Sequence, residues 1–79
     1  MSGVEQELRG IVGEYVKDKS VVLAADTSFT DIGLDSLDML MVVDAIETQF
    51  GVKFGDEDFA ELDTLGDAYR IVESRVGAA

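Results

Sequence analysis

The chain has 79 residues, 47% of them hydrophobic and 29% charged, which suits one small folded domain and excludes a disordered polymer. The chain has seventeen acidic and six basic residues, which gives a net charge of -11. This charge disfavours binding to nucleic acid and favours partner proteins with basic patches. The alternative interpretation is that the acidic surface only keeps the protein soluble. The chain has no Cys and no His, which excludes disulfides, thiolate chemistry and the usual histidine-dependent hydrolases.

The first predicted element is an amphipathic helix over residues 4–17. Apolar residues recur at helical spacing and form one stripe: Val4, Leu8, Ile11, Val12, Tyr15 and Val16. Gly10 and Gly13 weaken the prediction, because glycine inside a helix costs about 1 kcal/mol relative to alanine.

A long connection follows, over residues 18–35, and its Asp, Thr, Ser and Gly residues favour turns. Five apolar residues in it are expected to reach the core: Val22, Leu23, Phe29, Ile32 and Leu34. Connections of this length are uncommon in small domains and are often functional.

The second helix is predicted over residues 36–50. Asp35 suits its N-cap, because a carboxylate accepts the unpaired amides of the first turn, and Gly51 suits its end. The core stripe predicted for this helix consists of Met39, Val42, Val43, Ile46 and Phe50.

A short helical turn is expected over residues 56–62, and a last helix begins after Thr64, its predicted cap. The stripe of this last helix consists of Leu65, Ala68, Tyr69, Val72 and Val76. No alternating strand pattern is present, so the prediction is an all-α fold: a small bundle of three main helices plus a short fourth, in a single domain over residues 1–79.

The second helix has a second apolar face, opposite its core stripe. Leu37, Leu40 and Met41 lie there, together with Asp44 and Thr48, and Asp38 and Glu47 lie at its margins. Either the long connection covers this face, or the face is an exposed docking patch with an acidic rim. Leu37 and Met41, nearest its centre, favour docking, whereas Leu40 fits both interpretations equally.

Ser36 stands between Asp35 and Leu37, at the start of this outer face. It could simply begin or cap the helix, but Asp35 already offers the cap. Amide dipoles at a helix start favour an attached phosphate, and without a base of its own this hydroxyl would have to be modified by another enzyme.

The run from Gly33 to Leu37, followed by Asp38 and a long apolar helix, resembles the acyl carrier proteins, and the resemblance covers nearly the whole chain. It implies that Ser36 carries a 4'-phosphopantetheine arm, transferred from coenzyme A by a phosphopantetheinyl transferase in a magnesium-dependent reaction. The arm's thiol would hold acyl groups as thioesters. The chain would thus be a carrier and not an enzyme, with no catalytic residue or metal site of its own.

In that family the helix beginning at the serine is the main docking surface for acyltransferase or ketosynthase-type enzymes with basic patches. By position, the resemblance assigns docking to Asp35, Leu37, Asp38, Met41, Asp44 and Glu47. Fatty-acid carriers usually have an acidic residue in place of Met41, an apolar one in place of Asp44, and Ala in place of Leu34. These departures favour polyketide or other specialised biosynthesis.

The resemblance leaves rival functions open: a fatty-acid carrier, a D-alanyl or other aminoacyl carrier and, in a different class, an unmodified acidic helical adaptor. Ser36→Ala separates carriers from the adaptor. A calcium site of the EF-hand type fits poorly, because the run from Asp26 lacks the required Gly and closing Glu. Some carriers of that family house a growing acyl chain between their helices. Candidates to line such a cavity here are Met39, Val43, Ile46 and Phe50, but the alternative interpretation is that these residues only form the core.

The predicted location is the cytoplasm and the predicted state is a monomer. No apolar run approaches the roughly 18 residues of a membrane span. The first residues, MSGVEQELRG, lack the charged and apolar regions of a signal peptide.

Overall fold

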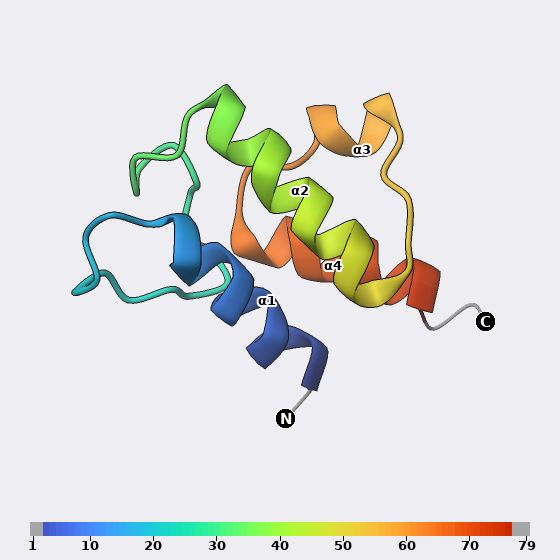
Figure 1. Ribbon diagram of the computed structural model, residues 1–79, viewed down its shortest axis with the longest axis horizontal. Helices are drawn as coiled ribbons and strands as arrows, with labels where there is room; N and C mark the ends of the chain where they lie inside the picture. Colours follow the sequence, from blue (N-terminus) through green and yellow to red (C-terminus); the bar gives the residue numbers. More distant parts are fainter. Residues whose placement is uncertain (1–2, 77–79) are drawn as a thin grey trace.

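The computed structural model describes residues 3–76 and contains four helices there (Figure 1): α1 (Gly3–Tyr15), α2 (Ser36–Phe50), α3 (Asp56–Ala60) and α4 (Leu65–Val76). Helix α1 packs against both α2 and α4. The predicted all-α fold of three main helices and a short fourth is confirmed. None of the helices in the described part of the chain is both long and apolar enough to cross a membrane.

The bounds of α2 agree with the prediction, with Asp35 as its N-cap and Gly51 as a left-handed C-cap at φ 67°. Helix α1 ends at Tyr15, two residues before the predicted end, and runs through both of its interior glycines. Helix α3 ends at Ala60 and not at residue 62, because Leu62 leaves the helix and is buried in the core.

Thr64 caps α4 as predicted. Its Oγ1 accepts a hydrogen bond of 3.1 Å from the amide of Asp67, and the Asp67 carboxylate accepts one of 2.9 Å from the amide of Thr64. This reciprocal pair satisfies amides that have no partner inside the helix.

The core is built from one face of each long helix and from the connections. Its buried residues in the three long helices are Leu8, Ile11 and Val12 in α1, Met39, Val42, Val43 and Ile46 in α2, and Leu65, Ala68, Ile71 and Val72 in α4. The stripe predicted for the last helix was wrong at one end: Val76 is 39% exposed, and Ile71 is buried in the core without having been predicted.

The long connection, residues 16–35, contributes Val16, Phe29 and Leu34 to the core. The prediction for Val22 was wrong, since its side chain is 82% exposed. Val21 and Leu23, on either side of it, pack against the core, whereas Val22 faces outward.

This connection is tied to the start of α4 by backbone hydrogen bonds. The amide of Phe29 donates to the oxygen of Asp63 (2.9 Å), that of Leu65 donates to Thr27 (3.2 Å), and that of Gly66 donates to Ala25 (2.7 Å). The connection thereby satisfies first-turn amides of α4. In Figure 1 it arcs out from the end of α1 and returns to the start of α2.

Candidate functional site

A tight turn over residues 29–34 immediately precedes the N-cap of α2. The amide of Gly33 donates to the oxygen of Thr30 (3.0 Å), and the amide of Leu34 donates to the oxygen of Phe29 (3.1 Å). Gly33 has a φ of 86°, in the left-handed region that side-chain-bearing residues rarely adopt. Because Phe29 and Leu34 are both buried, the next residue, Asp35, emerges at the surface in a fixed place.

Asp35 and Asp38 cap α2 reciprocally. An Asp35 carboxylate oxygen accepts a hydrogen bond of 2.9 Å from the amide of Asp38, and an Asp38 carboxylate oxygen accepts one of 3.2 Å from the amide of Asp35. The hydrogen bond from the Asp38 amide is the main cause that holds the pKa of the Asp35 carboxyl below its ordinary value, and the positive charge of Lys17 is the smallest cause. Both carboxylates are therefore engaged in hydrogen bonds that cap the helix.

Ser36 is the first residue of α2, and its side chain is exposed. Asp35 is the N-cap, so Ser36 has no capping role, and within residues 3–76 its hydroxyl makes no hydrogen bond. An exposed, unengaged hydroxyl at the positive end of a 15-residue helix fits a covalently attached phosphate.

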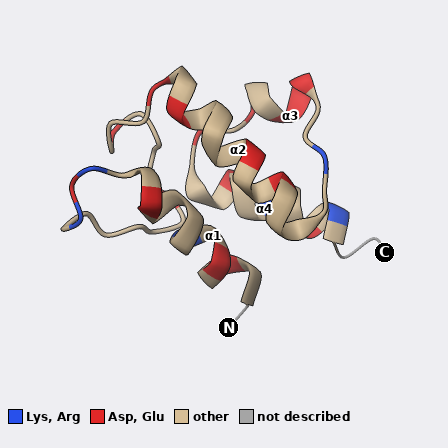
Figure 2. Cartoon of the chain, in the orientation of Figure 1, with Lys and Arg blue, Asp and Glu red and all other residues tan. Residues whose placement is uncertain are grey.

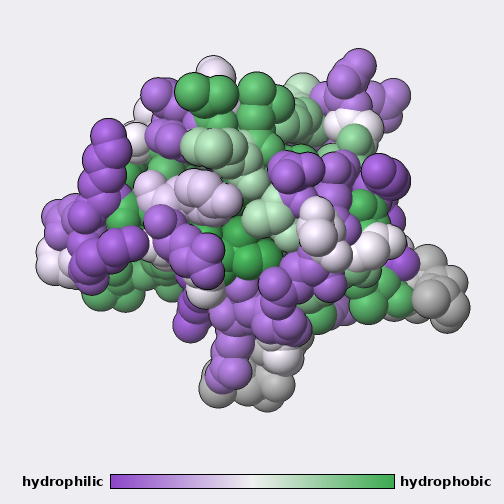
Figure 3. Space-filling view, viewed as in Figure 1, coloured by the Kyte–Doolittle hydropathy of each residue, from purple (hydrophilic) through white to green (hydrophobic). Residues whose placement is uncertain are grey.

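The outer face of α2 continues from Ser36 as apolar surface. Leu37 is 64% exposed, Leu40 57% and Met41 42%. The long connection therefore does not cover Leu40, which sequence alone left undecided. Figure 3 shows hydrophobic surface over the first half of α2, with hydrophilic surface beside it. These three residues are called the apolar patch below.

Acidic residues follow the apolar patch along α2, which carries three acidic residues and no Lys or Arg (Figure 2). Asp44 is exposed and makes no hydrogen bond within the described residues. Glu47 is half-buried, and its carboxylate accepts a hydrogen bond of 2.7 Å from the amide of Phe54. Glu47 therefore lies beside the outer face of α2, and its hydrogen bond also holds the connection after α2 in place.

An open hollow of about 250 Å³ lies at the far end of this face. It is lined by Asp44, Glu47, Thr48, Gly51, Val52 and Lys53. Sequence patterns did not point to Lys53 as a member of this surface, because it lies beyond the end of the helix. Its positive charge sets this end of the face apart from the end at Ser36.

The residues considered for housing an acyl chain are packed into the core. Met39, Val43 and Ile46 are buried, and Phe50 is half-buried. They line neither this hollow nor a second one beside the end of α1. Within residues 3–76, no group of three or more acidic side chains is arranged to hold a metal ion.

Comparison with known proteins identifies the family. The family model described as "Phosphopantetheine attachment site" matches residues 6–72. An acyl carrier protein of Treponema pallidum subsp. pallidum is 37% identical over 70 residues, which are 87% of this chain and 90% of that protein.

Two further relatives extend the similarity. The acyl carrier protein of Phenylobacterium zucineum is 34% identical over 79 residues, 99% of this chain and 100% of the relative. That of Thermotoga maritima is 33% identical over 72 residues, 90% of this chain and 89% of the relative. The chain therefore belongs to the phosphopantetheine-binding family of acyl carrier proteins, whose covalently attached prosthetic group is 4'-phosphopantetheine.

Proposed function

We propose that Ser36 is the attachment residue and that the chain is a single carrier domain presenting acyl groups to partner enzymes. The observation that carries the assignment is the exposed hydroxyl of Ser36, which makes no hydrogen bond within residues 3–76. Ser36 is the first residue of α2 and lies two residues after the buried Leu34. Asp35 and Asp38 satisfy the helix end without it. Ser36 is therefore free to be modified without loss of a structural hydrogen bond.

The attachment step needs chemistry that the partner supplies. In a magnesium-dependent reaction, a phosphopantetheinyl transferase would remove the Ser36 proton. The Oγ would form a bond to the pantetheine-linked phosphorus of coenzyme A, and adenosine 3',5'-bisphosphate would leave. The chain contributes an accessible hydroxyl and a docking surface, and the attached arm supplies the thiol on which acyl groups are held as thioesters.

Partner docking is assigned to the outer face of α2. Asp35, Leu37, Met41 and Asp44 are exposed there. Asp38 and Glu47 are half-buried and also bind backbone amides, so they would add negative charge more than direct contact. Leu40 belongs with them, because it is exposed beside Leu37. The matching partner surface is an apolar depression rimmed by Lys or Arg, as on an acyltransferase or ketosynthase.

The pathway that we propose is polyketide or another specialised biosynthesis. Met41 supports it, because its side chain extends the apolar patch where fatty-acid carriers usually have an acidic residue. The acidic residue of this chain, Asp44, lies about one turn after Met41 along the helix. A partner that docks here meets the apolar patch with negative charge on both sides of it, from Asp35 before the patch and from Asp44 after it.

Intact-mass measurement tests the attachment residue. The protein would be incubated with coenzyme A, magnesium and a broad-specificity phosphopantetheinyl transferase, with Ser36→Ala and Ser20→Ala alongside. Ser20 is an exposed serine of the same connection, so its variant is the matched control. The wild type and Ser20→Ala should each gain one phosphopantetheine unit, and Ser36→Ala should gain none. Modification of Ser36→Ala would reject the assignment.

A charge-conserving exchange tests the pathway. Met41→Asp combined with Asp44→Met keeps the composition and restores the usual fatty-acid arrangement. With the malonyl transferase of a fatty-acid synthase, the exchanged holo-protein should be loaded faster than the wild type. Equal loading, with full elongation of the wild type by fatty-acid enzymes, would place this chain in fatty-acid synthesis instead.

A further inference from the structure

Attachment at Ser36, on which this inference rests, would place a tethered acyl group at one end of the apolar patch. Leu37 follows Ser36 directly, and Leu40 lies one turn after Ser36, so the side chains of Ser36 and Leu40 are neighbours on the helix surface. Met41 lies one turn after Leu37 in the same way. The apolar patch therefore begins beside the attachment residue and follows the first half of α2, where Figure 3 shows hydrophobic surface.

The prosthetic arm is long enough to bring its cargo back to this patch. From Ser36 to Met41 the helix axis advances by about 7.5 Å, at about 1.5 Å per residue. A phosphopantetheine arm has about 14 bonded atoms from its phosphorus to its sulfur and spans roughly 18 Å when extended. A flexible tether of this kind holds its end at an effective concentration on the order of a millimolar, so even a weak contact with the patch is populated.

The inner face of α2 offers the cargo no comparable surface. Met39, Val43 and Ile46 are buried among other core residues, and they line neither of the two hollows already described. An acyl group that entered the core would have to displace packed side chains. The patch needs no such displacement, because Leu37 is 64% exposed and Leu40 57%.

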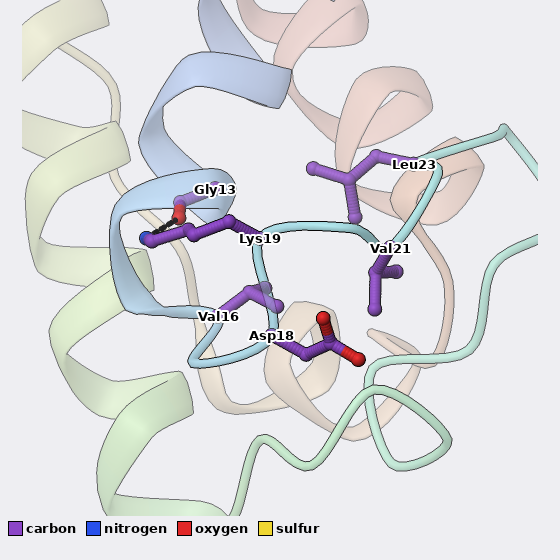
Figure 4. A pocket seen from close by; sticks show the side chains of 6 residues that line it. All are labelled: Gly13, Val16, Asp18, Lys19, Val21 and Leu23. Carbon is purple, nitrogen blue, oxygen red and sulfur yellow. Dashed lines mark hydrogen bonds between the residues drawn. The ribbon is translucent and has the colours of Figure 1, made fainter.

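The two hollows suit an aliphatic group less well than the patch does. Asp18 and Lys19 belong to the lining of the hollow beside the end of α1, and Lys19 donates a hydrogen bond of 2.6 Å to the carbonyl oxygen of Gly13 there (Figure 4). The hollow at the far end of α2 is lined in part by two acidic residues and a lysine. An aliphatic group in either hollow would remove water from charged side chains without offering them a partner.

The charges around the patch limit the kind of cargo that it can bind. Asp35 and Asp38 lie at its start and Asp44 lies beyond its end, and α2 contains no Lys or Arg. An uncharged aliphatic group meets no repulsion from these carboxylates, whereas an acyl group with a free carboxylate, such as malonyl, does. An acetyl group has too little apolar surface to gain much from the contact.

We propose that the apolar patch is a binding site for the protein's own acyl cargo. Leu37, Leu40 and Met41 bind uncharged aliphatic acyl groups of about six carbons or more while no partner enzyme is docked. The contact is hydrophobic, and no bond is made or broken in it. Since the same residues are proposed to dock partner enzymes, cargo and partner compete for the patch, and docking exposes the acyl group to the partner.

The experiment compares three cargoes on the full chain. A broad-specificity phosphopantetheinyl transferase would load the protein from octanoyl-, octanedioyl- or acetyl-coenzyme A, and intact mass would confirm each product. Octanedioyl has the length of octanoyl but ends in a carboxylate, which makes it the matched control for charge. The readouts are nuclear Overhauser contacts from the acyl methylene or methyl protons to side-chain methyl groups, and the chemical shifts of those side-chain methyl groups.

The octanoyl group should contact the methyl groups of Leu37, Leu40 and Met41, and the other two cargoes should contact them at least about threefold more weakly. Leu40→Ser should weaken the remaining octanoyl contacts by a similar factor. Val22→Ser removes an exposed apolar side chain outside α2 and should leave the contacts unchanged. Because both substitutions are at exposed positions, circular dichroism should show the wild-type fold for each.

The outcomes separate this inference from the attachment itself. Octanoyl contacts with Val43 and Ile46 in place of the patch, no contact with any side chain, or unchanged contacts in Leu40→Ser would overturn the binding site and leave Ser36 as the attachment residue. Equal contacts from octanoyl and octanedioyl would overturn the selection by charge. Absence of any added mass in the folded wild type, or added mass on Ser36→Ala, would overturn the attachment.

Discussion

The amide of Gly66 donates a hydrogen bond of 2.7 Å to the carbonyl oxygen of Ala25, and a Cβ added at Gly66 would lie only 2.9 Å from that same oxygen. This contact joins the first turn of α4 to the long connection, and the same connection leads through Phe29 and Leu34 to Asp35. The position of Ser36 therefore depends on a close approach of two backbone segments that both lie outside α2.

Gly66→Ala is expected to destabilise the protein by about 1–3 kcal/mol, because a backbone oxygen cannot move aside as a flexible side chain can. Gly10→Ala is the matched control, since its added Cβ meets nothing within 4 Å and it lies inside α1. That substitution should stabilise by up to about 1 kcal/mol. Urea unfolding of both variants measures the difference, and equal free energies of unfolding would show that the close approach does not exist.

Two valines test the observed core against the surface. Val42→Ala should lower the free energy of unfolding by about 2 kcal/mol, because Val42 is fully buried in α2. Val22→Ala should change it by less than about 0.5 kcal/mol, because Val22 is 82% exposed. A large loss at Val22 would mean that the long connection packs as sequence predicted and not as the structure has it.

Protonation of the Asp58 carboxyl is expected to lower the free energy of unfolding at acid pH. Its hydrogen bond from the amide of Gly55, together with its ion pair with Arg75, holds its pKa below the ordinary value. Because the native pKa is depressed, the stabilisation is fully present above the unfolded value of about 4 and is lost as pH falls through the native pKa.

Asp58→Asn should therefore show a shallower loss of stability below pH about 4 than the wild type, in chemical unfolding followed by circular dichroism. Asp44→Asn serves as the control, because it removes an exposed carboxylate that makes no hydrogen bond within residues 3–76. An acid profile of Asp58→Asn parallel to that of the wild type would contradict the assignment.

Leu40 is expected to matter for partner enzymes and not for folding. Leu40→Ser should leave the melting temperature nearly unchanged and lower kcat/KM for phosphopantetheinyl transfer by about tenfold, as loss of an apolar contact within an interface can do. Val22→Ser, an exposed apolar residue away from α2, should transfer at the wild-type rate. Equal rates for the two variants would exclude the apolar patch from this docking step.

Local signals predicted the parts of the fold that depend on neighbouring residues. The start of α2 at Ser36 and its end before Gly51 were correct, because a capping carboxylate and a left-handed glycine act within one turn. Periodicity also placed the core face of α2. The all-α class followed from the same periodicity and from the absence of alternating runs.

What sequence could not predict depends on contacts between distant segments. Val21 and Leu23 pack against the core while Val22 between them faces outward, and the hydrophobicity of the three residues does not tell which of them is buried. The exposure of Leu40 depends on where the long connection runs.

Reading out which residue carries the prosthetic group tests the central claim most directly. After modification by a phosphopantetheinyl transferase, cleavage at lysines would release the fragment of residues 20–53, which contains three serines: Ser20, Ser28 and Ser36. Fragment-ion spectra should place the added phosphopantetheine on Ser36 alone. Its placement on Ser20 or Ser28, or an unmodified fragment from folded protein, would contradict the account.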